Sequence, residues 1–323
     1  MDKQKRIYVH AAAGFVPHGV DRLQSLTADP DVDLRALARR VLGQNLRQAS
    51  HFVELAAIGA RLCFDRLPTP PAPDMAVYVG TALGEIRRTD SLSRQMLPPG
   101  PGIATPFDFI NASANMAAFY VARLAGVSAR NLTVTQGVFS FETALQLAIS
   151  DLGAGAVTAA LVGGVDENCF PRPQYLHRWP LRDDEFMGEG SAWLYLSTQP
   201  DAAIAELLWA QSLVAIPQQD LSLWTQTLEK VLVMPADATF TFVGGIGVTT
   251  SERAALMQRF PQAQWSSYVD YCGSYPTAAA YGVASTVARS LAPGQWVHVN
   301  RDADGATMVI RWCVAPTAPR ADS

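Results

Sequence analysis

The stretch NLTVTQGVFSFETALQLAISDLG, residues 131–153, together with AVTAALVGG, residues 156–164, decides the fold. A β-like run at 131–135 leads directly into a segment whose apolar residues Phe141, Leu145 and Ala148 have the spacing of a helix buried on one side. Gly153 is the expected stop of this helix. Residues 156–164 are nearly all apolar without polar alternation, which is typical of a strand covered on both faces. The stretch predicts a strand–helix–strand unit in a layered α/β fold.

Similar alternation of strand-like and helix-like segments continues along the chain. We expect strands at residues 6–13, 75–80, 131–135, 156–164, 192–197, 240–244, 295–300 and 307–314. Further helices are expected at about residues 48–63 and 116–124, at 221–232 behind the N-cap Asp220, and after Pro276. Breaker-rich segments at 68–73, 98–101 and 200–201 are expected to be loops. The last of them divides the chain into two predicted halves, residues 1–200 and 201–323.

Composition excludes several classes of protein. The chain has 323 residues, 49% of them hydrophobic and 17% charged, so it can bury a large core. A net charge of -4 gives no electrostatic footprint for nucleic acid. No apolar stretch is long enough for a membrane span, and no targeting segment is evident at the start, so we expect a cytoplasmic protein. The spacing of metal-binding and phosphate-binding motifs is missing, and we expect neither a metal nor a cofactor.

Six short motifs carry a resemblance to a known family. They are RIYV at 6–9, VGTALG at 79–84, TPFDFINASANM at 105–116, GVSARNLTVT at 126–135, LVGGVDE at 161–167 and FMGEG at 186–190. In this order they resemble β-ketoacyl synthases, the condensing enzymes of the thiolase-like superfamily, over about the first 200 residues. The resemblance implies a five-layered α-β-α-β-α fold built from two pseudo-related halves, with dimerisation through the strand at 131–135.

The family holds its acyl chain on a cysteine at a strand-to-helix turn, where the helix N-terminus lowers the thiol pKa. The matching turn here is TQGVFS, residues 135–140, and Val138 stands at the cysteine position. Sliding the register by two residues would place Gln136 there instead, as in chain-length-factor relatives. We favour Val138, because Gly137 and Ala144 then also match.

The family also needs two histidines that stabilise the enolate formed on decarboxylation. In the matching turns, Gly244 replaces the first histidine and Ser274 replaces the second. A nearby lysine of the family falls near Val269, and the glycine-rich loop after the strand at 297–300 is replaced by the shorter, polar segment 301–305. Every matched catalytic position therefore lacks the chemistry that condensation requires.

Other reactive side chains have more ordinary interpretations. Cys169 and Cys272 are expected to be packed thiols, although Cys272 would lie near the position of the family's active-site pocket. His177 is expected to be a surface or capping residue, and His298 a structural one. A relocated nucleophile at Ser140 stays open, as it does at Ser274 and Cys272.

Four residues are expected at a substrate tunnel or a subunit interface. By register with the family they are Leu83, Asp108, Phe109 and Ser113. The alternative for these positions is ordinary interface packing.

These observations predict a non-catalytic, chain-length-factor-type subunit. The resemblance implies that it pairs with an active ketosynthase in a type II polyketide, aryl polyene or fatty-acid-like pathway and shapes its acyl tunnel. The implied partners are that ketosynthase and an acyl carrier protein with a phosphopantetheine-linked chain. Two alternatives are a malonyl or acyl thioester decarboxylase or acyltransferase with a relocated nucleophile, and a homodimeric scaffold.

Overall fold

The computed structural model describes residues 5–17, 33–46, 48–98, 100, 102–168, 187–235, 238–289 and 293–314. The strands are β1 (Ile7–Phe15), β2 (Ala76–Gly80), β3 (Asn131–Val134), β4 (Ala159–Asp166), β5 (Gly190–Ser197), β6 (Ala205–Leu213), β7 (Phe240–Gly244), β8 (Ala263–Ser267), β9 (Gly294–Arg301) and β10 (Thr307–Val314). The helices are α1 (Leu34–Leu42), α2 (His51–Phe64), α3 (Ile86–Met96), α4 (Pro106–Asn111), α5 (Met116–Ala125), the 3-10 turn η1 (Gly137–Phe139), α6 (Ser140–Ala154), α8 (Leu221–Leu232), α9 (Thr250–Arg259), α10 (Val269–Cys272) and α11 (Ala278–Arg289).

In the described part of the chain, one ten-stranded sheet has the order β3-β2-β4-β5-β1-β6-β10-β9-β7-β8. From either outer edge inward, each set of five strands follows the same order: third, second, fourth, fifth, first. β2, β3 and β4 are parallel, as are β7, β8 and β9, whereas β5 and β10 run antiparallel to their neighbours. The two sets meet where β1 pairs with β6. The repeated order supports two pseudo-related halves. Their division at residue 200, between β5 and β6, stays a proposal.

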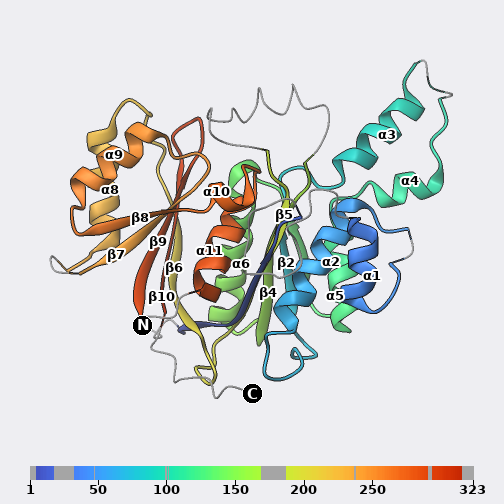
Figure 1. The fold of residues 1–323 in the computed structure, drawn as a ribbon, viewed down its shortest axis with the longest axis horizontal. Helices are drawn as coiled ribbons and strands as arrows, with labels where there is room; N and C mark the ends of the chain where they lie inside the picture. The colour runs from blue at the N-terminus through green and yellow to red at the C-terminus, as the bar shows by residue number, and fades with distance from the viewer. Residues whose placement is uncertain are drawn as a thin grey trace.

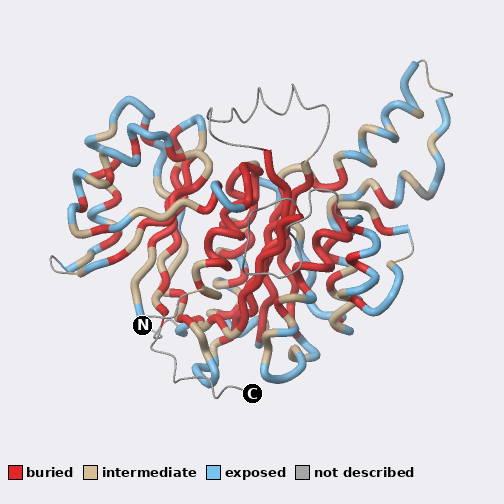
Figure 2. Tube along the Cα trace, viewed as in Figure 1, coloured by how far each residue is buried: buried red, intermediate tan, exposed pale blue. Residues whose placement is uncertain are grey.

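Helices cover the two outer faces and fill the space between the halves (Figure 1). α1, α2 and α5 pack on the outer face of the first five strands, and α8 and α9 on the outer face of the last five. α6 and α11 form the layer in the middle. In Figure 2, buried residues concentrate in the strands and in α6 and α11. The predicted five-layered α/β fold is confirmed.

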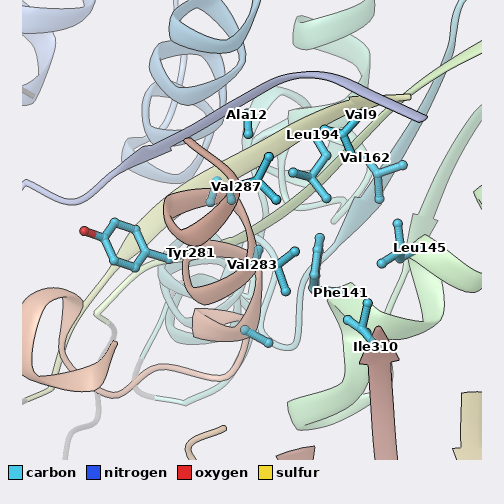
Figure 3. Close-up of a cluster of buried hydrophobic side chains, with 14 of the residues drawn as sticks. Val9, Ala12, Phe141, Leu145, Val162, Leu194, Tyr281, Val283, Val287 and Ile310 are labelled. Carbon is cyan, nitrogen blue, oxygen red and sulfur yellow. The ribbon is translucent and has the colours of Figure 1, made fainter. Parts of the chain in front are cut away.

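The central layer forms because α6 and α11 are apolar towards both halves. Figure 3 shows Phe141 and Leu145 of α6 with Val283 and Val287 of α11, among side chains from strands of both halves. Burial of each large apolar side chain contributes about 1.5–3 kcal/mol to the free energy of unfolding. This layer therefore fixes the first turn of α6 relative to the strands of both halves.

Several boundaries differ from the prediction. α6 continues through Gly153 and ends at Ala154, because Gly155 adopts the left-handed conformation (φ 72°) that ends a helix. The expected N-cap is confirmed, since the Asp220 carboxylate accepts a hydrogen bond from Leu223 N at 3.0 Å. The sequence missed β6 and β8. β8 reads AQWSS, and three polar residues in five hide it from an apolar-run criterion.

Candidate functional site

The strand-to-helix turn between β3 and α6 lies against the second half of the chain. Val138 sits in η1 and is 9% exposed, in a small apolar cluster with Phe139 and Met308. Ile246, from the loop after β7, and Ala306, from the β9–β10 turn, pack against this cluster. An apolar side chain thus occupies the turn and is covered by residues from the second half.

The polar residues of this turn are already engaged in local hydrogen bonds. Ser140 is fully buried, and its Oγ donates to Gly137 O (2.7 Å) and accepts from Gln136 N (2.8 Å). The side chain of Gln136 is exposed, and its Oε1 accepts from Thr143 Oγ1 at 2.7 Å. The two residues considered for the nucleophile position therefore differ in environment, because Val138 faces the second half and Gln136 faces outward.

A buried polar network lies beneath the turn. His298 Nδ1 is 3.0 Å from Val243 O, and because a carbonyl only accepts, Nδ1 carries the proton. His298 Nε2 lies 3.2 Å from Glu142 Oε1, and this contact is a hydrogen bond when one of the two atoms carries a proton. Asn300 Nδ2 donates to Glu142 Oε1 (2.9 Å) and to Val138 O (3.0 Å). The network ties the first turn of α6 to β7 and β9.

The sequence predicted a structural role for His298 but missed its partner Glu142. Glu142 is fully buried in the first turn of α6, where an isolated carboxylate would be costly. The available signal was its place beside Phe141 on an apolar helix. The partner itself is 156 residues away in the chain, and local patterns do not reveal such a pairing.

Gly244, which the resemblance predicts at the first histidine position, ends β7. A Cβ placed there would overlap the ring of Trp265 on the neighbouring strand β8. A hollow of about 320 Å³ opens beside it at the carboxyl ends of β7 and β8. It is lined by Gly244, Gly245, Val248, Thr250, Arg253, Trp265, Ser267, Val269 and Asp270. The hollow is thus bordered by both the histidine position and the lysine position, and the sequence did not identify Trp265 as the residue beside them.

Ser274, which the resemblance predicts at the second histidine position, lies between α10 and α11. It forms a parallel bridge with Met187 ahead of β5, and its carbonyl accepts from Gly188 N at 3.1 Å. Ser274 is 6% exposed. The nearby Cys272 is 1% exposed, and its Sγ lies 3.2 Å from Gly273 O. Val138 and the loop after Gly244 meet through Ile246, whereas Ser274 packs near the start of β5.

β9 ends at a fully buried arginine, Arg301. The Arg301 guanidinium pairs with Glu252, donates to Ile216 O and lies 4.7 Å from the centre of the Trp224 ring. Glu252 also caps α9 by accepting from Thr249 N at 2.8 Å. An ion pair therefore stands where the resemblance predicted a glycine-rich loop.

Leu83 lies in the loop after β2, next to a buried carboxylate. Asp166 Oδ1 accepts from Thr81 Oγ1 (2.8 Å), Ala82 N (3.0 Å) and Leu83 N (3.0 Å). Burial raises the pKa of Asp166 to about 6, against the lowering effect of these hydrogen bonds. Leu83 thus takes part through its backbone in holding the end of β4 to the end of β2.

Asp108, Phe109 and Ser113 lie on or just after α4. We call α3, α4 and their connection, residues 86–111, the α3–α4 arm. It projects from the body of the molecule (Figure 1). Phe109 is 67% exposed and Ser113 is exposed, whereas Asp108 accepts from Thr105 Oγ1 at 2.7 Å, which lowers its pKa. The arm therefore presents an apolar surface to the outside.

The described residues hold no group of three or more His, Cys, Asp or Glu side chains that could bind a metal. Among the same residues, no helix is long and apolar enough to cross a membrane. Cys169 and His177 lie outside the described residues, as does Phe186 of the FMGEG motif.

Comparison with known proteins agrees with this geometry. Residues 47–177 match the family described as Beta-ketoacyl synthase, N-terminal domain. No curated protein sequence matches the chain. The strand-to-helix turn and β2 to β4 fall inside the matched region, whereas Gly244 and Ser274 fall outside it.

Solved structures resemble the chain over nearly its whole length. "The ishigamide ketosynthase/chain length factor" is 18% identical, with a TM-score of 0.74 over 96% of this chain and 99% of that one. A type II polyketide acyl-carrier protein in complex with its hexaketide-bound ketosynthase is 12% identical, with a TM-score of 0.74 over 97% of this chain and 100% of that one. A β-ketoacyl synthase from Burkholderia phymatum STM815 is 16% identical, with a TM-score of 0.70 over 96% of this chain and 100% of that one. At these identities the likeness establishes the ketosynthase fold of the chain.

Proposed function

We propose that this chain is a non-catalytic, chain-length-factor-like subunit that pairs with an active ketosynthase and completes its acyl tunnel. The observation that carries the proposal is the strand-to-helix turn. A buried valine stands there within an intact ketosynthase fold, covered by Met308 and Ile246. Valine offers neither a nucleophile nor a transferable proton, so no acyl chain can be loaded at Val138.

The emptied histidine positions support the same assignment. Gly244 provides no imidazole, and Trp265 occupies the space that a side chain there would need. Ser274 is buried, and so are the other two candidates for a relocated nucleophile, Ser140 and Cys272. Without aimed donors, the enolate that condensation requires would not be stabilised. The burial of these hydroxyl and thiol groups argues against the decarboxylase and acyltransferase alternative.

The proposed pairing surface runs along the free edge of β3. This strand is at the end of the sheet and is exposed, including Leu132 at 37%. Phe119 of α5 and Phe109 and Ile110 of α4 are at least half exposed as well. No described residue pairs with this strand edge, and such an edge, like exposed apolar side chains, is suited to contact a second subunit. The chain-length-factor and carrier-protein complexes among the similar folds make a ketosynthase and an acyl carrier protein the proposed partners.

The test is co-expression with an active ketosynthase, taken from an adjacent reading frame if one encodes it, followed by native mass spectrometry of the purified complex. We expect a one-to-one heterodimer and a change in product length when this chain is left out. A chain that stays a stable homodimer and changes neither activity nor product length would overturn the proposal and favour the scaffold alternative.

A matched pair of variants tests the β3 edge. The carbonyls of Arg130 and Val134 accept from β2, so the backbone of Thr133 points to the free edge. Thr133→Pro should remove an edge donor without breaking the β2 pairing, and it should weaken the complex at least about tenfold, whereas Thr133→Val should leave it unchanged. Equal binding by the two variants would remove β3 from the interface.

A further inference from the structure

The α3–α4 arm is joined to the body through charged groups. Helix α3 has no buried residue, and Figure 2 shows most of the arm exposed. Its apolar side chains Met96, Leu97, Ile103, Phe109 and Ile110 are more than half exposed. The arm therefore gains little from apolar burial, and its position depends on the polar contacts at its base.

Glu85, the residue before α3, is the centre of that base. It is 2% exposed, and its Oε1 accepts from Ser50 Oγ at 2.5 Å, which links it to the start of α2. Arg88 lies 3.8 Å from Glu85 Oε2 and 3.5 Å from Asp108 of α4, and it donates to Gln48 O at 3.0 Å. One arginine thus connects both arm helices to the body.

Two further carboxylates lie at the same base. Glu167, just after β4, is 1% exposed and 3.0 Å from Arg87 Nε. Glu189, ahead of β5, is 4% exposed and its Oε1 lies 2.8 Å from His51 Nε2. Among the described residues, the titratable and charged groups around Glu85 are Arg87 and Arg88 on α3, His51 on α2, Glu167 after β4, Glu189 before β5 and Asp108 on α4. We call Glu85, Glu167, Glu189, His51, Arg87 and Arg88 the arm-base cluster.

Buried carboxylates that face one another resist being charged together. Burial, with the nearby charge of Glu167, raises the pKa of Glu85 to about 7 despite the Ser50 hydrogen bond and Arg88. Burial likewise raises the pKa of Glu167 to about 6. Both groups hold a proton more tightly in the closed arm base than in water.

We propose that the arm-base cluster is a protonation-sensitive latch that sets how firmly the α3–α4 arm is held against the body. Because the arm carries part of the proposed pairing surface, the latch would tie subunit association to pH; that consequence rests on the proposed function.

The sign of the effect follows from the raised pKa values. A carboxyl group with a raised pKa stabilises the closed base when it is protonated, and this stabilisation is lost as pH rises through about 7. If the pKa of Glu85 is about 7 in the closed base and 4.5 in the open arm, the equilibrium constant for opening the arm increases about tenfold from pH 6 to pH 8. Glu167 adds about twofold in the same direction.

Amide hydrogen exchange of residues 86–98 and 102–111 in the full chain tests the latch. After correction for the intrinsic exchange rate at each pH, protection of the arm should fall about twentyfold between pH 6 and pH 8, the product of the Glu85 and Glu167 effects. Glu85→Gln keeps an acceptor for Ser50 and cannot ionise, so its arm should change by about twofold or less. Asp90→Asn, which removes an exposed carboxylate from the same helix, should behave as wild type.

Arm protection that is the same at both pH values, or a change of tenfold or more that survives in Glu85→Gln, would overturn the latch. The measurement uses this chain alone, so it is independent of any partner. If the arm responds to pH but no ketosynthase binds, the proposed function fails and the latch stands. If a ketosynthase binds but the arm ignores pH, only the latch fails.

Discussion

The two halves of the chain use equivalent strand ends in opposite ways. β4 and β9 hold the same place in their halves, and they end in Asp166 and Arg301. Asp166 accepts from the loop after β2, whereas Arg301 pairs with Glu252 on the helix after β7. β2 and β7 are equivalent too, and both end in glycine, Gly80 and Gly244.

The glycines also face different neighbours. A Cβ at Gly80 would stand 2.5 Å from the backbone of Ser140 and Phe141, whereas one at Gly244 would overlap a tryptophan side chain. The first half thus packs the end of β2 against the backbone of α6 and holds the end of β4 to the loop after β2 through a buried carboxylate. The second half closes its strand ends with large side chains and a buried ion pair. Repeated topology therefore does not imply repeated chemistry.

The largest expected effect is at Arg301. Replacing it with methionine leaves Glu252 buried without its cation, and we expect a loss of about 3–5 kcal/mol in the free energy of unfolding. Urea denaturation monitored by tryptophan fluorescence measures it. Arg253→Met, at an exposed arginine stacked on Trp265, is the matched control and should cost less than about 1 kcal/mol.

A double variant sharpens this comparison. Arg301→Met combined with Glu252→Gln removes both charges, so it should be more stable than the sum of the single losses by at least about 1 kcal/mol. Strict additivity would mean that the pair does not act as a unit.

Asp166 should come next. Asp166→Ala leaves the Thr81 hydroxyl and two backbone N–H groups without their acceptor, with an expected loss of about 3 kcal/mol. Asp65→Ala, at an exposed carboxylate paired with Arg61, should cost less than about 1 kcal/mol. If the two variants are equally stable, the end of β4 is not held by Asp166.

The smallest effects distinguish the two glycines. Gly80→Ala should cost about 2–3 kcal/mol, because the backbone of α6 cannot move aside. Gly244→Ala should cost about 1 kcal/mol, and Trp265→Leu should relieve that cost. Thermal unfolding of the three variants and the double variant measures both. A larger loss at Gly244 than at Gly80 would reverse the comparison.

Local sequence patterns predicted much of the first half. The unit β3, α6 and β4 follows from the spacing of Phe141 and Leu145 and from the apolar run at 156–164, because both elements bury regular faces. β6 escaped prediction because its burial depends on its pairing with β1 and β10. The α3–α4 arm escaped because it has no apolar face against the body.

The sequence could propose single positions for the site. Val138, Gly244 and Ser274 were assigned by register with the family, and these assignments stay predictions. What fills the site could not be predicted in this way. Met308 on Val138, Trp265 on Gly244 and Glu142 with His298 are contacts between distant segments. Such pairings follow from the packing of the two halves around α6.

We propose that this chain retains a ketosynthase fold without the ability to carry an acyl chain. Intact-protein mass spectrometry after incubation with malonyl and acyl phosphopantetheine thioesters tests it most directly, with an active ketosynthase treated in parallel. We expect the mass of this chain to stay unchanged while the ketosynthase gains the acyl group. A covalent adduct on this chain, mapped by peptide analysis to Ser140, Cys272, Ser274 or any other residue, would contradict it.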